Sequence, residues 1–112
     1  MRLARESDVV VTVHGCSEKD AVVLLGGLNG PFVCRIRDAL SSSGFPVDTR
    51  SGLQGLHPRN LCNLGRSGGG VQIELSSGLR RVMFMNLTRS GRRRTTNIFH
   101  RFVAVLTSTL SC

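Results

Sequence analysis

The 112-residue sequence contains no tryptophan and no tyrosine, and five phenylalanines are its only large aromatic residues. A hydrophobic core must therefore be built from valine, leucine and isoleucine. Hydrophobic residues make up 40% of the chain, which is typical of a globular rather than a disordered protein. No run approaches the roughly 20 apolar residues of a membrane span, and the chain does not begin with an apolar segment of signal-peptide type. We expect one small, soluble, cytoplasmic domain over residues 1–112.

Cysteine pairs at metal-binding spacing are also missing. The four cysteines are widely scattered, and no C-x-x-C pair occurs among Cys16, Cys34, Cys62 and Cys112. This spacing argues against a structural zinc module and against a disulfide-stabilised mini-protein. Reduced thiols in a cytosolic setting are the expected state.

Lysine is nearly missing, because Lys19 is the only one among fifteen basic residues. Against seven acidic residues, the arginines give a net charge of +8. Such a surplus suits polyanions, namely nucleic acid, anionic lipid or an acidic polymer, and arginine pairs with carboxylates and phosphates bidentately. The alternative is an arginine-rich composition whose charges are simply solvated. Base-stacking aromatics and recognised nucleic-acid-binding signatures are missing, so a nucleic-acid function rests on charge alone.

Hydrophobic periodicity predicts alternating strands and helices, and hence an α/β layer fold. The predicted strands span residues 9–13, 21–25, 45–50 and 71–76. The predicted helices span residues 31–42, 79–87 and a final segment capped by Thr95 or Thr96. The strand at 71–76 alternates most clearly, with Val71, Ile73 and Leu75 on one face. Residues 51–70 form a long region dense in glycine, proline and asparagine, of a kind that is more often functional than idle.

Two side chains in this pattern are suited to catalysis. His14 follows an apolar strand and precedes Gly15, and side chains at strand ends of α/β sheets are placed to meet ligands. A neutral imidazole is a good zinc ligand. Glu74 lies in the middle of a strand, where a carboxylate is disfavoured, and beside a metal-bound water it could act as a general base. The alternatives are a hydrogen-bonded structural histidine and a strand whose polar face meets solvent.

Several segments together resemble one family. In register along nearly the whole chain, residues 11–17, 26–29, 58–63, 70–80 and 101–103 are similar to the phage-type poly-γ-glutamate hydrolases, also labelled phage-related replication proteins. The resemblance implies a zinc peptidase with a partial mixed sheet and flanking helices, like the C-terminal part of a carboxypeptidase-like hydrolase. It implies that His14 binds the metal and that Glu74 is the catalytic carboxylate. It also implies that four residues hold the carboxylates of an anionic polymer substrate: Arg59, Asn60, Asn63 and Arg80.

One departure from the family pattern changes the expectation. Family members carry an earlier segment of the form His-Gly-Gly-x-Ile-Glu that supplies two further metal ligands, and this sequence has none. Its other histidines are His57, in the long loop, and His100, beside the apolar stripe of the last helix. We therefore expect an N-terminally truncated domain with an incomplete zinc site and an exposed sheet edge that favours self-association. The alternatives are a basic nucleic-acid-binding module and an inactive fragment. If the gene belongs to a phage, lysis would release the protein.

Overall fold

The computed structural model describes residues 9–49, 63, 65 and 69–110. Within them, strands β1 (Val11–Gly15), β2 (Val23–Gly26), β3 (Val47–Asp48) and β4 (Val71–Leu75) form one sheet. The helices are α2 (Gly30–Ser42), α3 (Ser77–Met83) and α4 (Asn97–Leu110), with a short 3-10 turn η2 (Gly91–Arg93) before the last helix. The mixed sheet with flanking helices confirms the predicted α/β class.

The sheet order is β1-β4-β2-β3, so the strand carrying Glu74 lies inside it. β4 is parallel to β1 and antiparallel to β2, and β2 is parallel to β3. The register places four residues in one row across the sheet: His14, Glu74, Leu24 and Asp48. Because side chains in a row project to the same face, this row gathers three ionisable groups on one side of the sheet.

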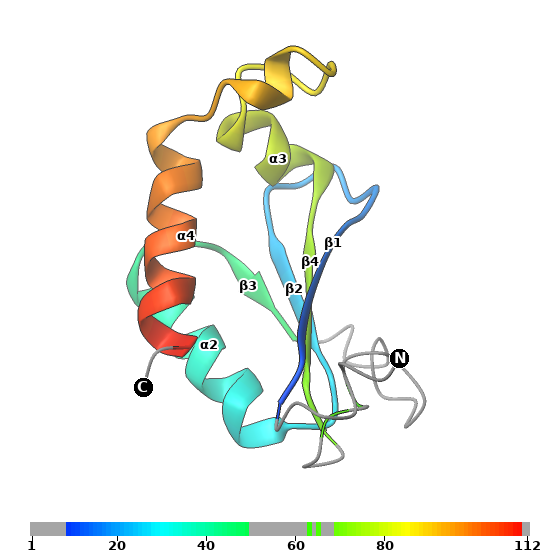
Figure 1. Cartoon of the computed structure of the whole chain (residues 1–112), viewed down its shortest axis with the longest axis vertical. Coiled ribbons are helices and arrows are strands. Elements are labelled where there is room, and N and C mark those ends of the chain that lie inside the picture. The colour runs from blue at the N-terminus through cyan, green and yellow to red at the C-terminus, as the bar shows by residue number, and fades with distance from the viewer. Residues whose placement is uncertain (1–8, 50–62, 64, 66–68, 111–112) are drawn as a thin grey trace.

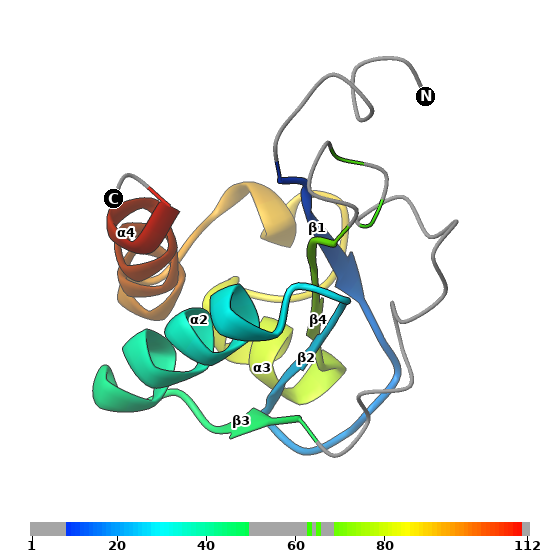
Figure 2. The same ribbon diagram turned by 90° about the horizontal axis from the view of Figure 1, so that it is seen from below.

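Helices α2 and α4 lie on the other side of the sheet (Figures 1 and 2), and α3 follows β4 at the end of the sheet and adds Leu79 and Met83 to the same core. This face carries Val71 and Ile73 of β4, both fully buried, and Val23 and Leu25 of β2. They pack against buried side chains of the helices and of the turn before β3, namely Ile36, Leu40, Phe45, Leu79, Met83 and Phe102. The core is therefore aliphatic with two phenylalanines, which contact each other edge to face at 5.7 Å between ring centroids.

The face opposite the helices is polar. Among the described residues no helix lies over it (Figures 1 and 2), and its side chains include Thr12, His14, Gln72 and Glu74. The alternation of β4 places its polar side chains on this face and its apolar side chains in the core. An apolar side chain is exposed at the sheet edge, where Val13 of β1 keeps 49% of its surface accessible.

The boundaries of several elements differ from the prediction. β1 spans Val11–Gly15 rather than 9–13, because its limits are set by pairing with β4 and not by the apolar run. His14 therefore lies within the strand and does not follow it. α3 ends at Met83, four residues before the predicted end. The hydroxyl of Thr96 donates to the carbonyls of Val82 and Met83, fastening the start of α4 to the end of α3.

No helix in the described part of the chain is both long and apolar enough to cross a membrane.

Candidate functional site

His14 and Glu74 are direct neighbours on adjacent parallel strands. Paired strands lie about 4.8 Å apart, and both side chains project to the polar face of the sheet. The histidine is exposed, whereas the glutamate is half-buried on the interior strand. The structure therefore brings together the two residues that the sequence singled out, although 59 residues separate them along the chain.

The carboxylate of Glu74 is only partly satisfied by the protein. Its Oε1 accepts a hydrogen bond from Nε2 of Gln72, two residues earlier on the same face, at 3.3 Å. Its Oε2 is buried, and no described residue donates to it. Oγ1 of Thr12, on the neighbouring strand beside Gln72, is likewise buried without a described partner. A buried acceptor left without a donor is costly, so the described chain leaves this carboxylate incompletely hydrogen-bonded.

The chain after β4 is fixed by one buried serine. Ser76 is fully buried, and its Oγ accepts hydrogen bonds from the backbone of Leu79 (3.0 Å) and of Val22 (2.9 Å). The first bond caps α3 and the second ties that cap to the start of β2. The strand end that carries Glu74 is thereby held by both the helix that follows it and the connection that precedes β2.

Arg80 joins the carboxyl ends of β1 and β4. Its Nη2 donates to the carbonyl of Cys16 at 2.8 Å and its Nε donates to that of Leu75 at 3.2 Å. The guanidinium lies against Gly15, where an added Cβ would be 2.9 Å from the guanidinium carbon. Among the described residues none accepts from Nη1. Arg80 thus holds the two strand ends together next to His14, and its contact with substrate stays a prediction.

Asn63 has a structural role in the described chain. It is 3% exposed, and its Oδ1 accepts hydrogen bonds from the backbone of Leu28 (3.1 Å) and Gly70 (3.0 Å). These bonds join the turn after β2 to the entry of β4. Its substrate-binding role stays a prediction. The other two loop residues predicted to bind substrate, Arg59 and Asn60, lie outside the described residues, as does His57.

Asp48 was not singled out from the sequence, yet it shares the row of Glu74 and His14, two strands from Glu74. Only the sheet register reveals it, because β3 is two residues long and its local sequence has no distinctive pattern. The remaining histidine, His100, is exposed on α4 and shares a hydrogen bond with Thr95 at 3.0 Å, far from the row in sequence and on another element.

The described residues do not complete a metal site. Across residues 9–49, 63, 65 and 69–110, no three histidine, cysteine, aspartate or glutamate side chains are grouped so as to hold a metal ion. A catalytic zinc ion generally has three protein ligands. The described part of the chain offers one imidazole and one incompletely bonded carboxylate side by side, which is fewer than the ion requires.

Comparison with known proteins identifies the family of this chain. A family model described as poly-gamma-glutamate hydrolase matches residues 1–105. The chain belongs to this family. The SPbeta prophage-derived UPF0714 protein YoqZ of Bacillus subtilis (strain 168) is 31% identical over 109 residues, which cover 94% of this chain and 40% of that protein.

Two solved structures share the fold of this poly-gamma-glutamate hydrolase family member. A bacteriophage poly-gamma-glutamate hydrolase superposes with a TM-score of 0.84 and 28% identity, covering 90% of this chain and 51% of that one. A zinc-free apo form of YndL superposes with a TM-score of 0.83 and 26% identity, covering 92% and 53%. The chain therefore spans less than half the length of YoqZ and about half the length of the two solved structures.

Proposed function

We propose that this chain takes part in zinc-dependent hydrolysis of the γ-glutamyl amide bonds of poly-γ-glutamate, as the family resemblance implies. One observation carries the proposal beyond family membership. His14 and Glu74 are neighbours in register on one sheet face, and Glu74 keeps a buried oxygen without a described donor. A reaction that removes a proton from water requires a base, and a carboxylate oxygen without a hydrogen-bond donor can accept that proton.

Glu74 is the residue assigned to proton transfer. Hydrolysis of an amide requires a base that takes a proton from the attacking water and an acid that gives a proton to the leaving amine. One carboxylate can do both in turn. The hydrogen bond from Gln72 fixes Oε1, so Oε2 is the oxygen left to accept the proton.

His14 is assigned as one ligand of the metal. Its imidazole is exposed beside the carboxylate, on an edge strand that leaves it open to an incoming group. Because the described residues provide too few donors, any further ligand has to come from outside the described ranges or from another chain.

The proposal is tested by measuring bound zinc and the release of glutamate oligomers from poly-γ-glutamate. We expect Glu74→Gln to lower hydrolysis by about 10²- to 10⁴-fold, because it removes proton transfer and keeps the shape of the side chain. We expect His14→Ala to lower bound zinc, while Glu74→Gln retains it. Asp20→Asn is the matched control, because it also removes one negative charge, at an exposed position of the connection before β2.

Turnover that persists in Glu74→Gln, or that is insensitive to a chelator, would overturn the assignment. A chain that binds no zinc and releases no oligomers would show that this chain by itself lacks the proposed activity.

A further inference from the structure

The positive charge of the chain is concentrated at its C-terminal side. Seven arginines follow Glu74 and no aspartate or glutamate does, so residues 75–112 contribute +7 of the net charge of +8. Five of these arginines are exposed on α3 and the loop between α3 and α4, namely Arg81, Arg89, Arg92, Arg93 and Arg94. None of the five forms an ion pair with a described residue. We call residues 85–94, together with Arg81, the arginine loop.

The arginine loop has a defined backbone scaffold. Oδ1 of Asn86 accepts hydrogen bonds from the backbone and the hydroxyl of Thr88, and the Thr88 hydroxyl oxygen accepts from the backbone of Gly91 at 3.1 Å. The backbone of Met85 donates to the carbonyl of Arg94 at 2.9 Å, which closes the two ends of the loop. The arginines of residues 85–94 therefore project from a hydrogen-bonded turn.

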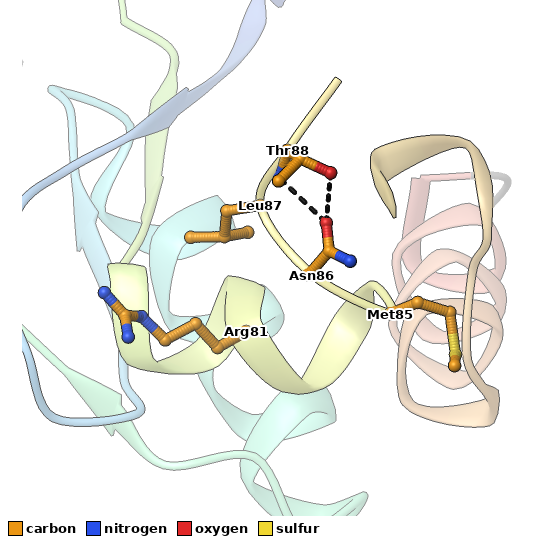
Figure 3. Close-up of a pocket in the computed structure, with 5 residues that line it drawn as sticks. All are labelled: Arg81, Met85, Asn86, Leu87 and Thr88. Atoms are coloured by element: carbon orange, nitrogen blue, oxygen red, sulfur yellow. Dashed lines mark hydrogen bonds between the residues drawn. The ribbon is translucent and has the colours of Figure 1, made fainter. Parts of the chain in front are cut away.

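Three adjoining hollows surround this turn. The first has a volume of about 410 Å³, with Arg81 projecting from α3 along one side and Leu87, Asn86 and Thr88 along the other (Figure 3). Arg89 and Arg93 line the second hollow together with Thr88 and Ser90. The third is lined by Met85, Asn86, Ser90, Gly91 and Arg94. The three hollows share lining residues, so four arginines border adjoining hollows that also contain exposed hydroxyl groups and the apolar side chains of Met85 and Leu87.

The arginine loop lies at the same end of the molecule as the carboxyl ends of β1 and β4 (Figure 1). Two consecutive residues of α3 connect the two regions. Arg80 contacts the strand ends beside His14, and Arg81 borders the first hollow. A long polymer with one bond at the His14–Glu74 pair would therefore have the arginine loop at the same end of the molecule.

We propose that the arginine loop is a second binding surface that holds free carboxylates of a poly-γ-glutamate chain away from the bond being cleaved. The identity of the polymer rests on the proposed function. Guanidinium groups pair with carboxylates through two parallel hydrogen bonds, and no acidic side chain of the described residues forms an ion pair with these arginines. A polymer with one free carboxylate per residue can engage several arginines at once, so weak individual contacts add through multivalency.

A nucleic acid fits this surface less well. Proteins that hold single-stranded nucleic acid combine basic side chains with aromatic platforms for the bases. Residues 85–97 contain no aromatic residue, and the nearest ones, Phe84 and Phe99, pack against each other at 5.4 Å between ring centroids. The surface therefore offers charge and hydroxyl groups without stacking.

The test measures binding of the full chain to fluorescein-labelled poly-γ-glutamate oligomers in the presence of a chelator, over a series of salt concentrations. The loop variant is Arg89→Gln with Arg93→Gln, which border the same hollow. The control is Arg35→Gln with Arg37→Gln on α2, at the other end of the molecule (Figure 1), which lowers the net charge equally. We expect about tenfold weaker binding for the loop variant, less than twofold weaker binding for the control, and a shallower salt dependence for the loop variant only.

Equal weakening in both double variants would show that only net charge matters and would overturn the proposal. Tighter binding of a labelled oligonucleotide than of poly-γ-glutamate, lost in the loop variant, would assign the surface to nucleic acid and also overturn it. The two proposals fail separately, because Glu74→Gln should lower hydrolysis by about 10²- to 10⁴-fold while loop-dependent polymer binding is retained. Loop-dependent binding without any hydrolysis would refute the proposed function alone.

Discussion

Replacing Glu74 with leucine should make the protein more stable. The buried Oε2 has no described donor, and an unsatisfied buried polar atom costs about 1–3 kcal/mol. The substitution also loses the hydrogen bond from Gln72, worth about 0.5–1.5 kcal/mol, and gains apolar contact with Leu24 in the same row. The sum predicts that the free energy of unfolding rises by about 1 kcal/mol while hydrolysis is lost.

Urea unfolding followed by circular dichroism measures this change, and a parallel thermal melt should shift upward by about 4 °C. Asp20→Leu is the control, since it removes the same charge at an exposed position and should change stability by less than about 0.5 kcal/mol. A loss of more than about 1 kcal/mol for Glu74→Leu would refute the reasoning, because it would mean that the carboxylate is held by the fold and stabilises it.

Two further predictions concern the supports of the site. Ser76→Ala should lower the free energy of unfolding by about 2–4 kcal/mol in the same urea assay, because it removes a helix cap and leaves two backbone donors without their acceptor. The control is Ser42→Ala, at an exposed position of α2, which should change the free energy of unfolding by less than about 0.5 kcal/mol. Gly27→Ala should destabilise the fold by more than about 1 kcal/mol, because its φ of +114° favours glycine and a Cβ there would collide with the backbone that enters β4. Gly30→Ala, where a Cβ meets nothing within 4 Å, is the comparison, and an equal effect of the two substitutions on the melting temperature would contradict this account.

The hydrophobic pattern of the sequence predicted which strands and helices form better than it predicted their first and last residues. The strict alternation at 71–76 and the helical spacing at 31–42 each reflect one buried face, and β4 and α2 formed where they were predicted. The limits of β1 depended on its partner, because pairing with β4 begins at Val11 and continues through Gly15. An edge strand pairs with a neighbour on one side only, so the ends of β1 are set by its pairing with β4 rather than by its own composition.

The site itself depends on register, which no local pattern encodes. His14 and Glu74 could be chosen separately, one as a possible ligand and the other as an unusual strand carboxylate. Their adjacency follows from a parallel pairing between segments about 60 residues apart. The family resemblance implied a shared site, but it did not reveal Asp48 in the same row or the use of Asn63 as a link between backbone segments.

The position of Arg80 gives a reason for the glycine that follows His14. β1 is an edge strand, and its carboxyl end needs an external constraint if the imidazole is to keep its place beside Glu74. The guanidinium provides that constraint by donating to the carbonyl of Cys16, two residues after His14, and to the carbonyl of Leu75, directly after Glu74. The absence of a side chain at position 15 leaves room for this arrangement, since a Cβ there would lie 2.9 Å from the guanidinium carbon and the guanidinium would have to shift. The glycine after the histidine thus serves the packing of an arginine that arrives 65 residues later.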